Sequence, residues 1–547
     1  MMNSNIYVIK RDGTKEPLII EKWQAQITKV CQGIADVSQS MIEIKSQPHF
    51  YNGITTNEID EITLRAIVNL IDVESNPDVG HVNYQYVAGK QRLSMLRKDV
   101  YGDYTPPHLY EIVKRNVAVG LYTPELLEWY TEDDWNKMND MLDHTKDEQY
   151  SYAAIEQLIE KYLVRNRATK EIYETPQVRY MVAAATVFHR EEPNTARMRY
   201  IREYYTAASD GLFTLATPVL AGLGTPTKQF SSCVLIRSDD DLDSIFASGE
   251  MMAKYASKRA GIGLEIGRLR PLGAPIRGGE IMHTGMLPFL KKWFGDLRSC
   301  SQGGIRNASC TVTYPIWHYQ FDDLIVLKNN QGTDETRVRH MDYNVVLSAF
   351  FWRRFKNKGN ITFFDPNEVP ELYEAFYRDA AEFEALYTRY ERRTDLRKKT
   401  MSAEEVFKGG ILKERTDTGR IYLTFIDNVQ AQGPFDTRVD PIYQSNLCQE
   451  ILLPTRSFKR LEDEDGRIAL CTLGSLNWGA FRNPEDMRRA ARILHRSLNN
   501  ILDYQDFLSV QSLKSNEEIR PLGIGVTNLA YWHAKREIGR ASCRERV

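Results

Sequence analysis

The stretch Gln444-Ser-Asn-Leu-Cys-Gln-Glu-Ile-Leu-Leu-Pro454 carries the most information in this 547-residue chain. In an extended backbone alternate residues face the same way, so Asn446, Cys448 and Glu450 would share one side. Asn446 and Glu450 would then lie roughly 13 Å apart, at about 3.3 Å per residue. If the amide, the thiol and the carboxyl group act on one small substrate, the segment must be a bent loop. The spacing alone leaves an alternative open, in which Cys448 packs in a core beside solvated polar neighbours.

The sequence around this stretch is typical of an α/β domain. From about residue 215, Gly and Ser become frequent and short apolar runs alternate with helical patterns. Strands separated by helices indicate an α/β sheet or barrel. The runs that we expect to form strands are residues 232–236, 261–266, 308–314, 421–425 and 468–471.

Two smaller parts precede this domain. Residues 1–100 combine a hairpin pattern around Gly13 with amphipathic helices, one of which Thr56 can cap, and this predicts a compact α+β unit. Residues 101–107 break the pattern as a linker, and helical periodicity then continues to residue 214. We therefore predict a domain over 1–100, a mainly helical domain over 101–214 and the α/β domain over 215–536.

Composition excludes several classes of protein. The 71 Lys and Arg residues nearly balance 73 Asp and Glu, with a formal net charge of −2, so nucleic acid is not expected as the main ligand. There is no apolar run of about 18 residues, and the first segment lacks the apolar core of a signal peptide. We expect no membrane association and a cytoplasmic location.

The seven cysteines are widely spaced and show neither a CxxC pair nor an HExxH motif or other metal-ligand spacing, so no metal site is expected. The ordinary role of such a cysteine is that of a small buried hydrophobic residue. Any chemistry must therefore be argued from the neighbours of each one. The cysteines are Cys31, Cys233, Cys300, Cys310, Cys448, Cys471 and Cys543.

The motif Asn-Leu-Cys-x-Glu, followed by an apolar run and Pro454, resembles the finger loop of the large (alpha) subunits of aerobic, class I ribonucleotide reductases. Segments 215–220, 229–235 and 468–477 resemble other parts of the same family. The resemblance implies an N-terminal ATP cone, a helical segment and a ten-stranded α/β barrel, incomplete here, with the finger loop at its centre. It also implies reduction of ribonucleoside diphosphates to 2′-deoxyribonucleoside diphosphates for DNA precursor synthesis.

The resemblance assigns roles to the cysteines and their neighbours. Cys448 would become a transient thiyl radical that abstracts the 3′ hydrogen of the ribose. Glu450 would act as base on the 3′ hydroxyl, and Asn446 would hold the ribose hydroxyls. Cys233 and Cys471 would supply two electrons and finish as a redox-active disulfide. The expected substrate-binding residues are Thr217, Ser232, Gly261, Asn446 and Glu450.

Two regulatory sites are implied in the same way. Residues 261–279 place glycines beside arginines, a combination that suits phosphate binding. This segment resembles the family's specificity-effector site. The residues that the resemblance assigns to that site are Asp240, Asp241, Leu242, Ser257, Arg270 and Arg277. The segment 300–309 resembles the loop that relays effector identity, although Asn307, Ala308 and Ser309 depart from the small residues expected there. The cone resembles an ATP/dATP switch, with nucleotide contacts at Lys10, Arg11, Glu16, Lys22, Thr56 and Lys98.

Asp60 stands where the family resemblance leads us to expect a histidine. An anion near a triphosphate repels it, so our hypothesis is that ATP/dATP control is altered or lost. Inhibition of the assembled enzyme by low micromolar dATP would contradict this hypothesis.

The resemblance also implies cofactors and partners. These are ATP and deoxynucleoside triphosphate effectors with Mg²⁺, a small (beta) subunit that carries a di-iron tyrosyl radical, a thioredoxin or glutaredoxin reductant, and a second copy of the chain in a homodimer.

The resemblance runs from about residue 5 to residue 535. We expect residues 537–547 to be a non-native, adapter-derived tail, in which Cys543 has no role. The family's radical-carrying tyrosines, substrate-diphosphate loop and tail cysteines would lie beyond it, so we expect this polypeptide alone, even with the small subunit, not to turn over. The alternatives are an inert nucleotide-binding fragment of such a subunit, or a ribonucleotide reductase of a different radical class.

Overall fold

The computed structural model describes residues 6–193, 196–300 and 308–536, and the chain divides into two compact units. The first unit comprises residues 1–228, 476–497 and 526–547, and the second comprises residues 229–475 and 498–525. The predicted tail at 537–547 and most of the predicted relay loop, residues 301–307, lie outside the described residues.

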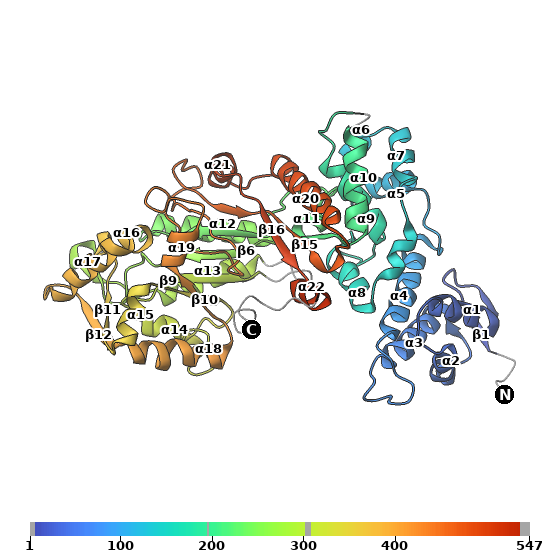
Figure 1. Cartoon of the computed structure of the whole chain (residues 1–547), viewed down its shortest axis with the longest axis horizontal. Coiled ribbons are helices and arrows are strands. Elements are labelled where there is room, and N and C mark those ends of the chain that lie inside the picture. The colour runs from blue at the N-terminus through green and yellow to red at the C-terminus, as the bar shows by residue number, and fades with distance from the viewer. Residues whose placement is uncertain (1–5, 194–195, 301–307, 537–547) are drawn as a thin grey trace. The chain divides into compact units, whose positions relative to one another are not determined.

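The first unit begins with a small α+β module. Strands β1 (Tyr7–Ile9), β2 (Lys15–Pro17) and β3 (Ile54–Thr55) form a sheet in the order β2-β1-β3. Helices α1 (Ile20–Cys31), α2 (Gln39–Ser46), α3 (Thr56–Asn69) and α4 (Tyr84–Tyr101) pack with it around a core that includes Val8, Trp23 and Ile67 (Figure 1). The cap of α3 is Thr55 and not Thr56, because Thr55 and Glu58 form a reciprocal capping box.

Helices dominate the rest of the first unit. In chain order they are α5 (Leu109–Ala118), α6 (Glu125–Trp129), α7 (Glu132–Asn139), α8 (Tyr152–Lys161), α9 (Pro176–Val187) and α10 (Ala196–Ser209). Strand β4 (Phe213–Leu215) and helix α11 (Thr217–Gly222) follow. Later segments of the chain supply most of α20 (Pro484–Tyr504) and α22 (Leu529–Lys535).

A six-stranded sheet organises the second unit, in the order β13-β10-β9-β6-β5-β14. The first five of these strands run parallel, and β14 is antiparallel to β5. The α/β class is therefore confirmed. Over the described residues this sheet is open, and a ten-stranded barrel is not closed. The strands are β5 (Cys233–Arg237), β6 (Gly261–Glu265), β9 (Cys310–Pro315), β10 (Asp342–Leu347), β13 (Ile421–Phe425) and β14 (Ala469–Cys471).

Helices connect the parallel strands and cover the sheet. Helix α12 (Leu242–Ser257) joins β5 to β6 and packs on both strands, and it also contacts α13 (Leu287–Ser299) (Figure 1). The other helices of this unit are α14 (Phe321–Ile325), α15 (Ala349–Lys356), α16 (Pro370–Arg378), α17 (Ala380–Arg392), α18 (Lys413–Thr418), α19 (Ile426–Gln432) and α21 (Val510–Glu518). Two antiparallel strand pairs complete it. Strand β7 (Pro275–Ile276) pairs with β8 (Ile281–Met282), and β11 (Asn360–Phe364) pairs with β12 (Lys398–Ser402). Strands β15 (Leu473–Asn477) and β16 (Gly523–Thr527) lie where the chain passes from one unit to the other.

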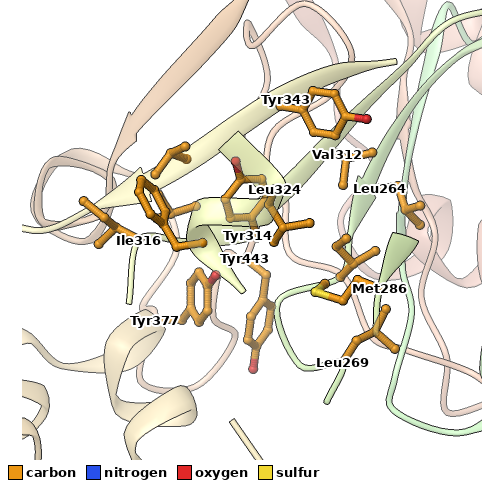
Figure 2. Packing of buried hydrophobic residues seen from close by; sticks show 14 of the residues in the cluster. Leu264, Leu269, Met286, Val312, Tyr314, Ile316, Leu324, Tyr343, Tyr377 and Tyr443 are labelled. Carbon is orange, nitrogen blue, oxygen red and sulfur yellow. The ribbon is translucent and has the colours of Figure 1, made fainter. Parts of the chain in front are cut away.

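One continuous apolar core fills the second unit. Leu264, Val312 and Tyr343 come from the adjacent strands β6, β9 and β10 and lie side by side in Figure 2. Each of these three side chains is fully buried. Strands β5, β6 and β9 are buried at every residue, as expected for parallel strands covered on both faces, so this part of the sheet is a rigid support for the loops at its ends.

Among the described residues no helix is both long and apolar enough to cross a membrane. Within the same residues no group of three or more His, Cys, Asp or Glu side chains is arranged to hold a metal ion.

A buried carboxyl group in the first unit gives a prediction about stability. Asp147 accepts a hydrogen bond from Gln177 at 2.8 Å, and Arg97 lies 3.8 Å from its other oxygen. Burial raises the pKa of Asp147 to about 7, and the hydrogen bond and Arg97 only partly offset it. The folded state therefore holds a proton that the unfolded chain releases above about pH 4. The contribution of this proton to the free energy of unfolding is fully present below about pH 4 and is lost as the pH rises to about 7. The loss is about 4 kcal/mol at most.

We expect Asp147→Asn, which keeps the size but cannot ionise, to flatten this dependence. The measurement is the midpoint of thermal unfolding by circular dichroism at intervals from pH 5 to pH 7.5. Wild-type and the control Asp133→Asn, whose carboxyl group is exposed on α7, should lose stability over this range. If the unfolding midpoint depended on pH in the same way for all three proteins, Asp147 would be ruled out as the source of the pH dependence.

Candidate active site and nucleotide sites

Cys233 and Cys471 lie opposite each other in the sheet. Cys233 begins β5, Cys471 ends β14, and the antiparallel register pairs the two residues directly. Directly opposed residues have Cα atoms about 4.5–5.5 Å apart, which is within the range that a disulfide bond spans. Both residues are at most 2% exposed, and both are thiols in this structure. The fold therefore brings together the two cysteines that the sequence singled out as a redox pair.

Ser232 is part of the same corner. Its backbone N–H donates to the Cys471 carbonyl oxygen at 2.9 Å, and its hydroxyl lies 3.5 Å from the Cys471 sulfur. The predicted substrate residue Ser232 is thus adjacent to the thiol pair. Thr217, another predicted substrate residue, belongs to the first unit, where it begins α11.

The finger loop, residues 444–454, is bent as its expected chemistry requires. Leu447 and Cys448 form a turn, and Gln449 has a positive φ of 66°. The predicted alternation is only partly right, because Asn446 is fully buried whereas Cys448 and Glu450 are exposed. The exposed position of Cys448 contradicts the alternative in which this cysteine is packed in a core.

Side-chain hydrogen bonds hold the loop in this shape. The Asn446 carbonyl oxygen, Oδ1, accepts from the backbone N–H groups of Glu450 at 3.0 Å and Ile451 at 3.2 Å. The amide nitrogen of Gln444 donates to the Ile236 and Gly263 carbonyl oxygens. Thr311 donates to the Leu447 carbonyl oxygen at 2.7 Å. These contacts fix the loop to strands β5, β6 and β9.

The glycines of β6 allow the loop to approach closely. A Cβ atom on Gly263 would lie 2.4 Å from the Ser445 carbonyl oxygen, and one on Gly261 would lie 2.5 Å from the Leu447 side chain. The Cβ position of Gly261 is also 3.3 Å from the Cys233 sulfur. The Cβ sides of these two glycines are covered by the finger loop, so a phosphate does not approach them from that side.

One polar group of the loop points to a ligand. The Asn446 amide nitrogen, Nδ2, is buried and has no hydrogen-bond partner among the described residues. A buried donor without a partner costs about 1–3 kcal/mol, so such a group is usually satisfied by water or a ligand. A ribose hydroxyl is an acceptor of the required kind.

The predicted effector residues separate into three places. Arg270 forms an ion pair with Asp240, with distances of 2.6 Å from Nε and 2.9 Å from the backbone N–H, and its Nη1 donates to the Pro275 carbonyl oxygen. Arg277 is exposed on the adjacent β7–β8 hairpin. Asp241 caps α12 and Leu242 is 60% exposed beside it. Ser257 lies at the other end of α12, about 22 Å from Leu242 at a rise of 1.5 Å per residue. A single chain therefore does not bring Ser257 close to the other predicted effector residues.

A cavity of about 730 Å³ lies in the N-terminal module. All six residues predicted for the activity site line it, namely Lys10, Arg11, Glu16, Lys22, Thr56 and Lys98. Among the wall residues that were not predicted are Gln26 and Tyr104. Tyr104 lies with its ring 4.5 Å from the Lys98 ammonium group, and its hydroxyl donates to Gln26.

Asp60 also lines this cavity and is already paired with cations. Its carboxylate lies 3.0 Å from the Lys98 ammonium group and 3.7 Å from the Arg11 guanidinium group. The side chain is only 7% exposed. Asp60 therefore competes with any phosphate for the two cations.

Comparisons with known proteins agree with this architecture. Family models match an ATP cone domain over residues 6–99, a ribonucleotide reductase all-alpha domain over 148–228 and a ribonucleotide reductase barrel domain over 231–544. Ribonucleoside-diphosphate reductase subunit alpha of Haemophilus influenzae is 45% identical over 98% of this chain and 70% of its own length. Ribonucleoside-diphosphate reductase 1 subunit alpha of Escherichia coli K12 is 44% identical over 98% of this chain and 69% of its own length. Ribonucleoside-diphosphate reductase subunit alpha of phage T4 is 39% identical over 97% of this chain and 69% of its own length.

The ATP cone domain, the all-alpha domain and the barrel domain with its thiol pair together define an oxidoreductase that carries a nucleotide-binding domain. The chain belongs to the ribonucleotide reductase family, with ribonucleoside-diphosphate reductase alpha subunits as its relatives. The family resemblance of the finger-loop motif is thereby confirmed.

Proposed function

We propose that this chain reduces ribonucleoside diphosphates to 2′-deoxyribonucleoside diphosphates, with Cys448 as the hydrogen-atom abstractor and Cys233 and Cys471 as the two-electron reductant. The observation that carries the proposal is the pairing of Cys233 with Cys471 in adjacent strands, next to a finger loop that is fixed to β5, β6 and β9. Thiols can perform both tasks, since one can abstract a hydrogen atom as a thiyl radical and two can supply two electrons by forming a disulfide.

Each step assigns one task to a residue of this chain. The Cys448 thiyl radical takes the hydrogen atom from C3′, and Glu450 accepts the proton of the 3′ hydroxyl. Asn446 donates its unpartnered amide N–H to the ribose. Cys233 protonates the departing 2′ hydroxyl, which leaves as water, and Cys471 joins it in the disulfide. Cys471 gives a hydrogen atom to C2′ as its sulfur bonds to the Cys233 thiolate, the resulting disulfide radical anion passes its extra electron to the 3′ ketone, and Glu450 returns its proton to the 3′ oxygen. The hydrogen atom then returns from Cys448 to C3′, which regenerates the thiyl radical.

The proposed partners follow from the relatives. The alpha subunits are expected to act with a beta subunit, for which we propose a di-iron tyrosyl radical, and with thioredoxin or glutaredoxin as reductant. We also propose a cytoplasmic homodimer regulated by ATP and deoxynucleoside triphosphates with Mg²⁺. Arg270, Arg277, Asp240, Asp241 and Leu242 would form the specificity-effector site, to which Ser257 of a second copy of the chain is a candidate contributor. Thr217, Ser232 and Gly261 would line the substrate position.

The proposal is tested by single turnover in a holoenzyme whose large subunit has the full length of these relatives. The pre-reduced enzyme, without external reductant, should convert about one ribonucleoside diphosphate per active site and lose two thiols, those of Cys233 and Cys471. Product formation with both thiols retained would refute the assignment of this pair.

The cone gives a separate prediction about nucleotide affinity. Asp60→Asn removes the anion that holds Lys98 and Arg11, so both cations can bind phosphate. We expect the Kd for ATP to fall about tenfold, which corresponds to about 1.4 kcal/mol. Isothermal titration calorimetry on the purified chain measures it. Glu61→Gln is the matched control, because it makes the same charge change on α3 at a residue that does not line the cavity. Equal affinity for wild-type and Asp60→Asn would show that Asp60 does not restrain binding.

A further inference from the structure

A buried cluster of charged and aromatic side chains lies at the ends of β5 and β6. The Arg237 guanidinium group lies 3.6 Å from the centre of the Tyr443 ring, and its Nε is 3.4 Å from a Glu265 carboxylate oxygen. Tyr373 donates to the other oxygen of Glu265 at 2.8 Å. Tyr377 packs against Tyr443, with 4.8 Å between ring centres, and the two side chains lie next to each other in Figure 2. Arg237 and Tyr443 are less than 10% exposed, and the others are fully buried.

The proposed chemistry uses none of these residues. Removing an arginine and a glutamate from water costs several kcal/mol per ion, which their attraction repays only with good geometry. An apolar core would therefore stabilise the sheet at least as well. Tyr443 directly precedes the finger loop, so the cluster fixes the point at which that loop leaves the core.

The cluster extends by direct contacts toward the predicted effector segment. Tyr443 donates its hydroxyl hydrogen to Glu374 at 3.0 Å, and the other oxygen of Glu374 accepts from Arg268 at 2.9 Å. Arg268 in turn lies 3.4 Å from Asp239. Asp239 accepts from the backbone N–H of Asp240, which is the residue that pairs with Arg270. This path avoids residues 301–307.

We propose that this network couples the effector segment to the finger loop, with Tyr443 as the positioning residue for Cys448. The proposal rests on the proposed effector role of Arg270 and Asp240. A triphosphate at Arg270 competes with Asp240 for the guanidinium group. The released carboxylate redistributes the contacts of Asp239 and Arg268, and Glu374 transmits the change to the Tyr443 hydroxyl group.

The experiment measures the alkylation of Cys448 in the purified chain. Because Cys448 is exposed, iodoacetamide reaches it, and mass spectrometry of its peptide gives a rate. Buried Cys310 serves as an internal reference for the integrity of the sheet. Rates are compared with and without saturating dTTP, whose Kd is measured for each protein. The variants are Tyr443→Leu, Tyr443→Phe and Glu374→Gln.

We expect dTTP to change the Cys448 rate of wild-type at least threefold. Tyr443→Leu should raise the rate without dTTP several-fold and abolish the response, with the Cys310 rate unchanged. Tyr443→Phe retains the ring on Arg237 and should restore the wild-type rate without dTTP, but it lacks the hydroxyl group and should not respond. Glu374→Gln tests the same link without altering the aromatic cluster, and it too should bind dTTP but respond less.

Different failures have different meanings. If dTTP binds to wild-type but leaves the Cys448 rate unchanged, the coupling is refuted and the effector site stands. If Tyr443→Phe and Glu374→Gln respond as wild-type does, the path through Tyr443 is refuted. If dTTP does not bind to wild-type, the effector assignment and the coupling both fail.

Discussion

Serine in place of Cys448 is expected to abolish deoxynucleotide formation while leaving the fold intact. The side chain is exposed on a turn, so the exchange of sulfur for oxygen disturbs no core packing. Hydrogen-atom abstraction from C3′ requires a radical on this side chain, and the much stronger O–H bond of serine prevents its formation. The measurement is product formed per active site in the full-length holoenzyme, which should fall to background.

Cys31→Ser is the matched control, because it removes a partly buried thiol from α1 of the N-terminal module. It should retain the wild-type rate. Substantial turnover by Cys448→Ser would remove the thiyl radical from the mechanism, even if the reductase activity itself were confirmed.

Alanine in place of Gly263 is expected to lower kcat about 100-fold, since a displacement of about 1 Å at reacting groups has an effect of this size. The added methyl group would lie 2.4 Å from the Ser445 carbonyl oxygen and 2.9 Å from the Asn446 Cα atom, so the backbone of the finger loop must move. The rate constant is measured in the same holoenzyme assay, and Cys448 alkylation reports the loop displacement independently.

Gly295→Ala supplies the control, because Gly295 lies within α13 and an added Cβ there meets no atom within 4 Å. It should leave kcat unchanged, with equal or slightly higher stability because alanine favours a helix. If Gly263→Ala turned over at the wild-type rate, the close contact of β6 with the loop would have no role in positioning Cys448.

The sequence predicts the strands that have clear apolar runs and misses others for physical reasons. The prediction of 421–425 coincides with β13, and 261–266 differs from β6 by one residue. Strand β10 was missed because it is buried on both faces between β9 and β13, so its residues do not alternate. Strand β12 begins with Lys398 and Lys399 at an exposed edge, and its charges are typical of a solvated segment.

In the candidate site too, local patterns could be predicted from the sequence but contacts between distant segments could not. The motif around Cys448 is local and could be identified directly, whereas the register that places Cys233 against Cys471 joins residues 238 positions apart. Gly263 was visible as one of two close glycines in a strand, a pattern that indicates close approach of another backbone. Which backbone approaches depends on the path of the finger loop, and the sequence does not encode that path locally. Family resemblance, and not spacing, supplied the pairing.

The most direct test of the proposed redox pair is disulfide mapping of the folded chain. The protein is treated with a stoichiometric amount of diamide, its remaining thiols are alkylated, and the linked peptides are identified by mass spectrometry. We expect a dominant Cys233–Cys471 linkage that a dithiol reverses, with Cys310 still reduced. Separate alkylation of Cys233 and Cys471, or a dominant linkage of either one to another cysteine, would contradict it.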